Sequence, residues 1–238
     1  MSNEWQNRDY AVDADRTYHE RYFRENNLSA PGSWLAGPDE FVLRQARSLA
    51  KNSYVVDVGC GPGRHAIPIA LYLKSLGGRV LCIDYLPIAL ERLSEAAEAA
   101  GVVDQIETQA IDVATTSLLA GSYDMCLAWS VWEATVPCAD IAAKLVELQE
   151  AAKSGGGLNV IMFNTEMRRF DASSGVELDA SSKLGNFNAR DLLSLLRRLY
   201  EGWSAIRIET RDDEEFVADG NRTDRWTAKQ VLFSARKP

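Results

Sequence analysis

The feature that most constrains the fold of this chain is an apolar run that leads into a glycine-rich turn and then into a second apolar run. Residues 54–58 read Tyr-Val-Val-Asp-Val, glycine follows at 59, 61 and 63, and apolar residues continue from Ala66 to Leu73. Glycine adopts backbone angles that other residues avoid, and it lets a ligand approach the main chain closely. We therefore expect a strand, a tight turn and a helix, with a binding cradle at the turn.

Further β-branched runs alternate with helical periodicity from about residue 53 onward, and this alternation is typical of a parallel sheet between layers of helices. The apolarity of these runs is nearly continuous, which suits strands that are covered on both faces. The expected strands are residues 54–58, 79–84, 105–110, 123–129 and 158–163. The fold class that follows is α/β.

Two helices are well marked by their ends. One begins at Pro87, repeats apolar residues on one face and closes at Gly101, since proline suits the first helical turn. The other follows Asn188, carries a stripe of leucines and stops before Gly202.

The two ends of the chain differ from this pattern. Residues 204–210 and 230–235 are expected strands joined by a polar connection, residues 211–228, that contains no helix, so we expect them to pair antiparallel. Residues 1–50 are rich in aromatic side chains and broken by Pro-Gly and Gly-Pro pairs. We expect residues 1–50 to form a helical cap over the edge of the sheet and residues 51–238 to form the binding domain.

A second strand ends about twenty residues after the glycine turn, in Asp84. A carboxylate at that distance is placed to accept both hydroxyls of a ribose. Dinucleotide binders of the hydride-transfer kind have a third glycine one position later, where this chain has Arg64. The glycine turn and Asp84 together indicate a nucleotide cradle whose spacing differs from that of a dinucleotide site.

These motifs together resemble the class I S-adenosylmethionine-dependent methyltransferases, over about residues 53 to 235. The motifs are Asp57-Val-Gly-Cys-Gly-Pro-Gly63, Asp84, Asp112, Tyr123-Asp124 and Lys153-Ser-Gly-Gly-Gly157. The resemblance implies a Rossmann-like, doubly wound sheet of seven strands with an antiparallel last strand. It also implies S-adenosylmethionine as cofactor and S-adenosylhomocysteine as product.

Within that superfamily the chain more loosely resembles the tellurite-resistance methyltransferases and other small thiol or chalcogen methyltransferases. Four segments carry this likeness: Glu20-Arg21-Tyr22, Cys60-Gly-Pro-Gly-Arg64, Leu199-Tyr-Glu-Gly-Trp203 and Phe233-Ser-Ala-Arg-Lys237. That group has a histidine and an arginine in the connection before the final strand. Here the comparable stretch offers Arg222 and Arg225 without a histidine.

The expected site has a cofactor part and an acceptor part. The cofactor part consists of Asp57, Gly59, Gly61, Gly63, Arg64, Asp84, Tyr85, Asp112, Val113 and Trp129. The resemblance places Asp84 on the ribose, Asp112 on the adenine amino group and Val113 and Tyr85 beside the ring.

The acceptor part consists of Glu133, His19, Arg222 and Arg225, with no metal, because two histidines leave no multi-histidine site. A soft, ionised acceptor needs only orientation and cationic positioning. An oxygen or amine acceptor needs a base such as Glu133, His19 or His65. Arg222 and Arg225 would grip an anionic acceptor.

The net charge of the chain limits the kinds of partner that it is expected to bind. Against 26 Lys and Arg stand 34 Asp and Glu, a net charge of −8, which disfavours nucleic acid and anionic membranes. We expect a cytoplasmic monomer or homodimer that methylates a small molecule. The alternatives are a nicotinamide-dependent oxidoreductase and a non-catalytic cofactor-binding module on the same fold.

Overall fold

The computed structural model describes residues 2–26, 33, 35–133, 135–178, 187–219 and 222–238. Its centre is one mixed sheet with the strand order β3-β2-β1-β4-β5-β8-β7, and β6 pairs with β5 beside this path. The strands are β1 (Tyr54–Val58), β2 (Arg79–Asp84), β3 (Ile106–Ala110), β4 (Met125–Trp129), β5 (Leu158–Asp171), β6 (Glu177–Leu178), β7 (Ser204–Asp219) and β8 (Arg222–Arg236).

Strands β1 to β5 run parallel, and β8 runs antiparallel to both of its neighbours, β5 and β7. This arrangement confirms the predicted Rossmann-like α/β sheet with seven strands along its main path and an antiparallel last strand. The carboxyl ends of the parallel strands share one edge, and the glycine turn and Asp84 lie there because they follow β1 and end β2.

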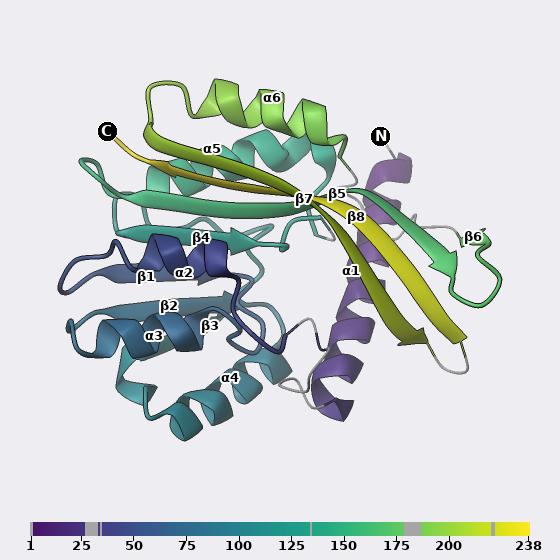
Figure 1. Ribbon diagram of the computed structural model, residues 1–238, viewed down its shortest axis with the longest axis horizontal. Helices are drawn as coiled ribbons and strands as arrows, with labels where there is room; N and C mark the ends of the chain where they lie inside the picture. Colours follow the sequence, from purple (N-terminus) through teal and green to yellow (C-terminus); the bar gives the residue numbers. More distant parts are fainter. Residues whose placement is uncertain (1, 27–32, 34, 134, 179–186, 220–221) are drawn as a thin grey trace.

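Six α-helices are described in the chain: α1 (Ser2–Glu25), α2 (Glu40–Ala46), α3 (Ala66–Lys74), α4 (Pro87–Ala100), α5 (Ile141–Ala151) and α6 (Ala189–Leu199). One apolar core packs α2, α3 and α4 on one face of the sheet, and a second packs α5 and α6 on the other. Figure 1 shows these two layers, with α1 beyond the ends of the parallel strands, where its C-terminal end contacts α4.

Local signals fixed several element boundaries. Strands β1 and β2 and the start of α4 have the predicted limits, and Gly101 ends α4 in the left-handed conformation at φ 66°. Asn188 caps α6 by accepting the N–H of Arg190 at 2.9 Å. Strand β5 continues to Asp171, well past its predicted end at residue 163.

The prediction of a polar connection over residues 211–228 is wrong. These residues extend β7 and β8 into one long hairpin, paired as far as Asp219 with Arg222, and β8 also pairs with the extended β5. We call residues 211–219 and 222–229 the distal hairpin. Charged side chains lie on both faces of the hairpin, so its sequence lacks the alternation of apolar and polar residues that indicates a strand. Backbone hydrogen bonds to the neighbouring strands keep the segment extended.

The N-terminal region contains the 24-residue helix α1 and the short helix α2, which begins just after the break expected at Gly37 and Pro38. The breaks expected at Pro31 and Gly32 lie outside the described residues. The division into a cap (1–50) and a binding domain (51–238) stays a prediction.

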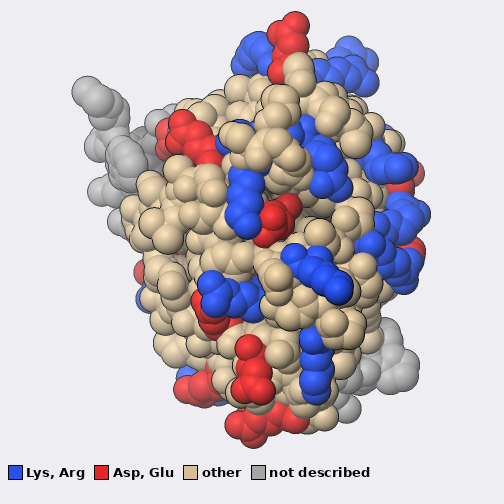
Figure 2. Space-filling model, turned by 90° about the vertical axis from the view of Figure 1, so that its left-hand side faces the viewer, with Lys and Arg blue, Asp and Glu red and all other residues tan. Residues whose placement is uncertain are grey.

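At the opposite edge of the sheet, where the parallel strands begin, side chains connect neighbouring strands. Asp124 accepts the N–H of Tyr54 and a hydrogen bond from Lys153, both at 2.7 Å, so these two motif residues tie β1, β4 and β5 together at their starts. Figure 2 shows this side of the molecule, where basic and acidic side chains are interspersed. None of the described helices is long and apolar enough to cross a lipid bilayer.

Candidate active site

The glycine turn closes over the end of β2. The N–H groups of Gly59 and Cys60 both donate to the carbonyl of Ile83, at 2.8 and 3.0 Å. Gly59, Gly61 and Gly63 all have positive φ, at 68°, 51° and 91°. The turn thus needs the left-handed backbone conformation three times, which explains why the sequence has glycine at alternate positions.

The three glycines differ in what surrounds them. A Cβ on Gly59 would lie 2.2 Å from Val131, and one on Gly63 would lie 2.4 Å from Leu93, so both positions are filled by packing. Among the described residues, a Cβ on Gly61 would meet only Phe23, at 3.9 Å. Gly61 is therefore the glycine that faces open space, and it is the place where a ligand can approach the main chain.

Asp84 connects β2 to this turn. Its carboxylate accepts the N–H of Gly61 and the N–H of Leu86, both at 2.9 Å, and the side chain is buried. Burial raises the pKa of Asp84, while the two backbone hydrogen bonds lower it. That Asp84 binds a ribose stays a prediction from the spacing.

Asp57 lies beneath the turn at the end of β1. It is 2 % exposed, and its Oδ2 has no hydrogen-bond partner among the described residues. Burial, aided by the nearby charge of Asp84, raises the pKa of Asp57 to about 8. At neutral pH this carboxyl is therefore mostly protonated.

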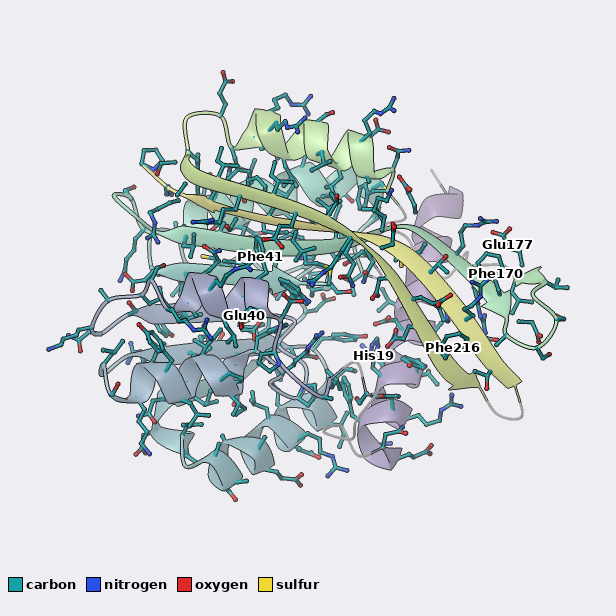
Figure 3. The ribbon with its side chains drawn as sticks, viewed as in Figure 1. His19, Glu40, Phe41, Phe170, Glu177 and Phe216 are labelled. Atoms are coloured by element: carbon teal, nitrogen blue, oxygen red, sulfur yellow. The ribbon has the colours of Figure 1, made fainter. Side chains whose placement is uncertain are left out.

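Helix α1 lies against this edge of the sheet. His19 Nδ1 is 3.2 Å from Asp15 Oδ2, and the hydroxyl of Tyr85 donates to the same Asp15 oxygen at 3.2 Å. The ring of His19 lies 5.6 Å from that of Phe23, whose Cζ would be 3.9 Å from a Cβ on Gly61, and the charge of His19 lowers the pKa of Asp84. Figure 3 shows His19 on α1 beside the body of the protein.

The end of α1 is fixed by α4. Phe23 is buried with Leu86 and Ala89, and Arg92 donates to the carbonyls of Phe23 at 3.0 Å and Arg24 at 3.2 Å. These donors satisfy carbonyls that a helix end leaves without partners. Sequence reasoning missed Asp15, Phe23 and Arg92, because nothing local marks a contact between helices so far apart in the chain.

Asp112 and Val113, which were predicted to bind the adenine, have these contacts in the structure. Asp112 Oδ1 accepts the N–H of Ala114 at 2.8 Å, so the carboxylate supports its own turn after β3. Val113 lines a small cavity together with Val58, Leu118 and Trp132.

Two buried aromatic residues lie beside the turn. The ring of His65 is 5.0 Å from that of Trp129, and both side chains are buried. Burial lowers the pKa of His65 to about 3, with the charge of Arg64 acting in the same direction. His65 is therefore neutral at physiological pH, and its position in the core argues against it as a base.

A chain of polar side chains runs from the segment after β4 across β5, β8 and β7. Buried Glu133 accepts the N–H of Asn164 at 2.6 Å. The amide of Asn164 donates to Ser130 at 2.8 Å and accepts from Gln230 at 3.2 Å, and Gln230 in turn accepts from Arg211 at 3.0 Å. Of these, only Glu133 was expected as a site residue.

One of the two arginines predicted as anion hooks, Arg225, is engaged within the hairpin. Arg225 donates to Glu214 at 2.9 Å, and its guanidinium lies 4.5 Å from the centre of the Phe170 ring. Arg225 pairs with Phe170 on β5 and with exposed Phe216 on β7. In Figure 3, Phe170 and Phe216 mark this far part of the molecule, away from α2. The guanidinium of Arg225 is thus committed to the hairpin, and the side chain of Arg222 lies outside the described part.

Comparisons with known proteins agree with this geometry. Residues 55–156, which include the glycine turn, Asp84 and Asp112, match the model of a family described as methyltransferase domain. No curated protein sequence matches the chain.

Solved structures extend the likeness to most of the chain. TehB from Haemophilus influenzae is 21% identical with a TM-score of 0.60, over 84% of this chain and 62% of that one. A putative methyltransferase from Bacillus halodurans is 16% identical with a TM-score of 0.57, over 87% of this chain and all of the other.

Phosphoethanolamine N-methyltransferase 2 from Haemonchus contortus, solved with S-adenosyl-L-methionine, is 14% identical with a TM-score of 0.63, over 98% of this chain and 60% of that one. This chain therefore spans less than two thirds of the length of TehB and of the Haemonchus enzyme. The predicted resemblance to class I methyltransferases is confirmed, and the chain has their fold.

Proposed function

We propose that this protein transfers the methyl group of S-adenosylmethionine to a small-molecule acceptor. The observation that carries the proposal is the junction of Asp84 with Gly61: a buried carboxylate at the end of β2, bound to the one turn glycine with open space above it. The methyltransferase-domain match over this segment supports it.

The residues present fit that cofactor. The open face of Gly61 admits a ligand against the backbone, and Asp84 can accept two ribose hydroxyls through its remaining lone pairs. We assign Asp57, Gly59 and Gly63 to the shape of the turn, and Tyr85, Asp112, Val113 and Trp129 to the walls. When bound, the cofactor supplies a methyl group on a sulfonium centre.

Catalysis then rests on orientation. The protein has to hold the nucleophile near 3 Å from the methyl carbon and keep water away, an effect worth about 7 to 11 kcal/mol for well-aligned reactants. Helix α1, with Tyr18 and Tyr22 stacked at 5.8 Å, is placed to exclude water on one side. The Ser130, Glu133 and Asn164 group borders the other side.

Two side chains are candidates for a base when the acceptor is an oxygen or an amine. Glu133 is buried at the end of β4, and His19 lies on α1 with Asp15 beside it. An acceptor that is already an anion would need neither. We therefore propose Glu133 and His19 as positioned proton acceptors whose use depends on the acceptor.

Calorimetry with purified protein tests the proposal. S-adenosylhomocysteine should bind, and NAD should not, because Arg64 stands where a dinucleotide site has its third glycine. Transfer of labelled methyl from S-adenosylmethionine to a panel of small thiols, amines and phenols would then identify the acceptor. Binding of NAD without binding of the sulfur nucleosides would favour the oxidoreductase alternative, and cofactor binding without transfer to any acceptor would favour a binding module.

A further inference from the structure

Strand β7 forms one border of the sheet along its whole length. The strand order ends with β7, so β8 is its neighbour on one side and no described strand lies on the other. At 16 residues β7 is longer than most strands, and Figure 1 shows it running from beneath α6 to the free end of the distal hairpin. Such an edge presents a row of backbone N–H and C=O groups that can pair with another strand.

This edge lacks most of the features that prevent such pairing. Proteins protect an edge strand with proline, with bulges, or with a loop or helix that covers it. Strand β7 contains no proline, and its ladder with β8 is regular from Arg207 to Asp219. None of the side chains described in residues 204–217 is buried. The remaining protection is the charge of the side chains, so their order decides what the edge can pair with.

The charged side chains on one face of β7 alternate in sign. Arg207, Glu209, Arg211 and Asp213 lie two residues apart along the strand and so share a face. Their charges are positive, negative, positive and negative, and the order is reversed when the strand is read backwards. A second copy of β7 that lies antiparallel, with Thr210 opposite Thr210, therefore meets each of these charges with one of opposite sign. Opposite charges directly across a strand pair stabilise the pairing, whereas like charges destabilise it.

Contacts inside one chain leave two of these four charges without a partner. The middle two are already paired with side chains of α2. Within the described part of the chain, Arg207 and Asp213 make no hydrogen bond or ion pair through their side chains, and both are exposed. They lie three residues before and three residues after Thr210. In the antiparallel arrangement Arg207 of each copy is thus directly opposite Asp213 of the other.

The other face of β7 fits the same register. Ile206 and Phe216 lie on that face, and these large apolar side chains are 46% and 61% exposed. In the register centred on Thr210, Ile206 lies diagonally across from Phe216 of the second copy, within reach of an aromatic ring. The acidic side chains between them on this face already have cations of β8 beside them. Pairing would therefore cover two exposed apolar side chains of each copy.

We propose that two copies of this chain associate through their β7 strands, antiparallel about a two-fold axis at Thr210, so that their sheets become one continuous sheet. A contact of this kind uses the same surface on both copies and is complete with two of them. It places the acidic run 212–215 of each copy opposite residues 205–208 of the other, so the two acidic runs stay apart. The inference does not rest on the proposed function, because it uses no residue assigned to the cofactor or the acceptor.

Reversal of single charges tests the pairing. Arg207→Asp places carboxylates opposite each other in the dimer, and Asp213→Arg places guanidinium groups opposite each other. Each variant alone should therefore dimerise at least tenfold more weakly than the wild type. An equimolar mixture of the two should form mixed dimers, because one chain then supplies both acids and the other both bases. The double variant Arg207→Asp, Asp213→Arg should dimerise as the wild type does.

Lys51→Glu is the matched control, since it reverses an exposed charge at the other end of the parallel strands. It should dimerise as the wild type does. Circular dichroism and thermal melts would establish that each variant is folded.

Analytical ultracentrifugation of the full chain over a range of concentrations would measure the association. The wild type should reach twice the 26.4 kDa of one chain, and the dimer should weaken as salt is added. Hydrogen exchange at low and high protein concentration would locate the contact, because the amides of residues 204–217 should exchange more slowly in the dimer.

Four results would overturn the proposal. They are a wild type that stays monomeric at every concentration, single variants that dimerise as tightly as the wild type, a mixture of the two variants that does not associate, and a dimer whose slowed exchange lies outside β7.

Discussion

The carboxylate of Asp84 accepts the backbone N–H of Gly61 at 2.9 Å, so a side chain at the end of β2 holds the glycine turn in addition to the backbone carbonyl of Ile83. The same carboxylate also accepts the N–H of Leu86 at the start of α4. One buried side chain thus joins three elements, and its remaining lone pairs face the proposed ribose position.

Replacing Asp84 by Asn should weaken the binding of S-adenosylhomocysteine by at least tenfold, or about 1.4 kcal/mol. The amide keeps the size of the side chain but has only one acceptor oxygen for backbone and ribose together, and it loses the charge that strengthens these bonds. Calorimetry would measure the change, with Asp104→Asn on the exposed surface as control. Equal affinity in a folded Asp84→Asn variant would rule out the ribose assignment.

Substitutions at Gly59 and Gly61 should affect the stability of the protein and its cofactor binding to different degrees. Gly61→Ala should fold with a loss of about 1 kcal/mol from its positive φ, yet lose cofactor binding, because its Cβ enters the open space. Gly59→Ala should lose about 1 to 3 kcal/mol more, because its Cβ would lie 2.2 Å from Val131. Urea unfolding and calorimetry on both variants would show the difference. If Gly61→Ala binds normally, the turn serves packing alone.

Asp57 should make the protein less stable as the pH rises. Its pKa is raised from 3.8 to about 8 in the folded state, so between those values the unfolded chain releases a proton that the folded chain keeps. Folded stability then falls from pH 4 to pH 8 and changes no further above it. Asp57→Asn has no proton to keep, so its stability relative to the wild type should increase over this range. Urea unfolding at pH 5 and pH 8 would measure the difference, and a gap that is the same at both values would contradict a protonated Asp57.

Contacts with α4 and Tyr85 should determine how tightly α1 is held. Arg92→Met removes two hydrogen bonds to the end of α1, and Tyr85→Phe removes the hydroxyl bound to Asp15. Each should cost about 1 kcal/mol, which corresponds to roughly fivefold faster amide exchange in α1 with the sheet unchanged. Hydrogen exchange by mass spectrometry would measure this, with Arg79→Met at the other edge of the sheet as control.

Removal of residues 1–30 tests the wider role of α1 as a cap. The truncated protein should lose methyl transfer, since Phe23 and the neighbouring His19 no longer lie beside Gly61. Full turnover by the truncated chain would show that the cap takes no part in the reaction.

Much of the body of the protein was determined locally by the sequence. The β1 strand, its glycine turn and the β2 strand ending in Asp84 follow from short-range signals, namely apolar runs of strand length and glycine where φ is positive. The ends of α4 and α6 follow from Gly101 and from the capping side chain of Asn188. Such signals depend on neighbours within a few residues, so the sequence reveals them directly.

The tertiary structure decided which partners the arginines of the distal hairpin contact. Residues 211–228 look like a polar loop because both faces of the distal hairpin carry charges. The pairing of β7 with β8 and of β8 with β5 makes the segment two strands. That register directs Arg225 to Glu214 and Arg211 to Asp39, a residue 172 positions away in the chain. A strand alternates its side chains between faces, so the choice of face is set by the partner strand and by what covers it, which no local pattern contains.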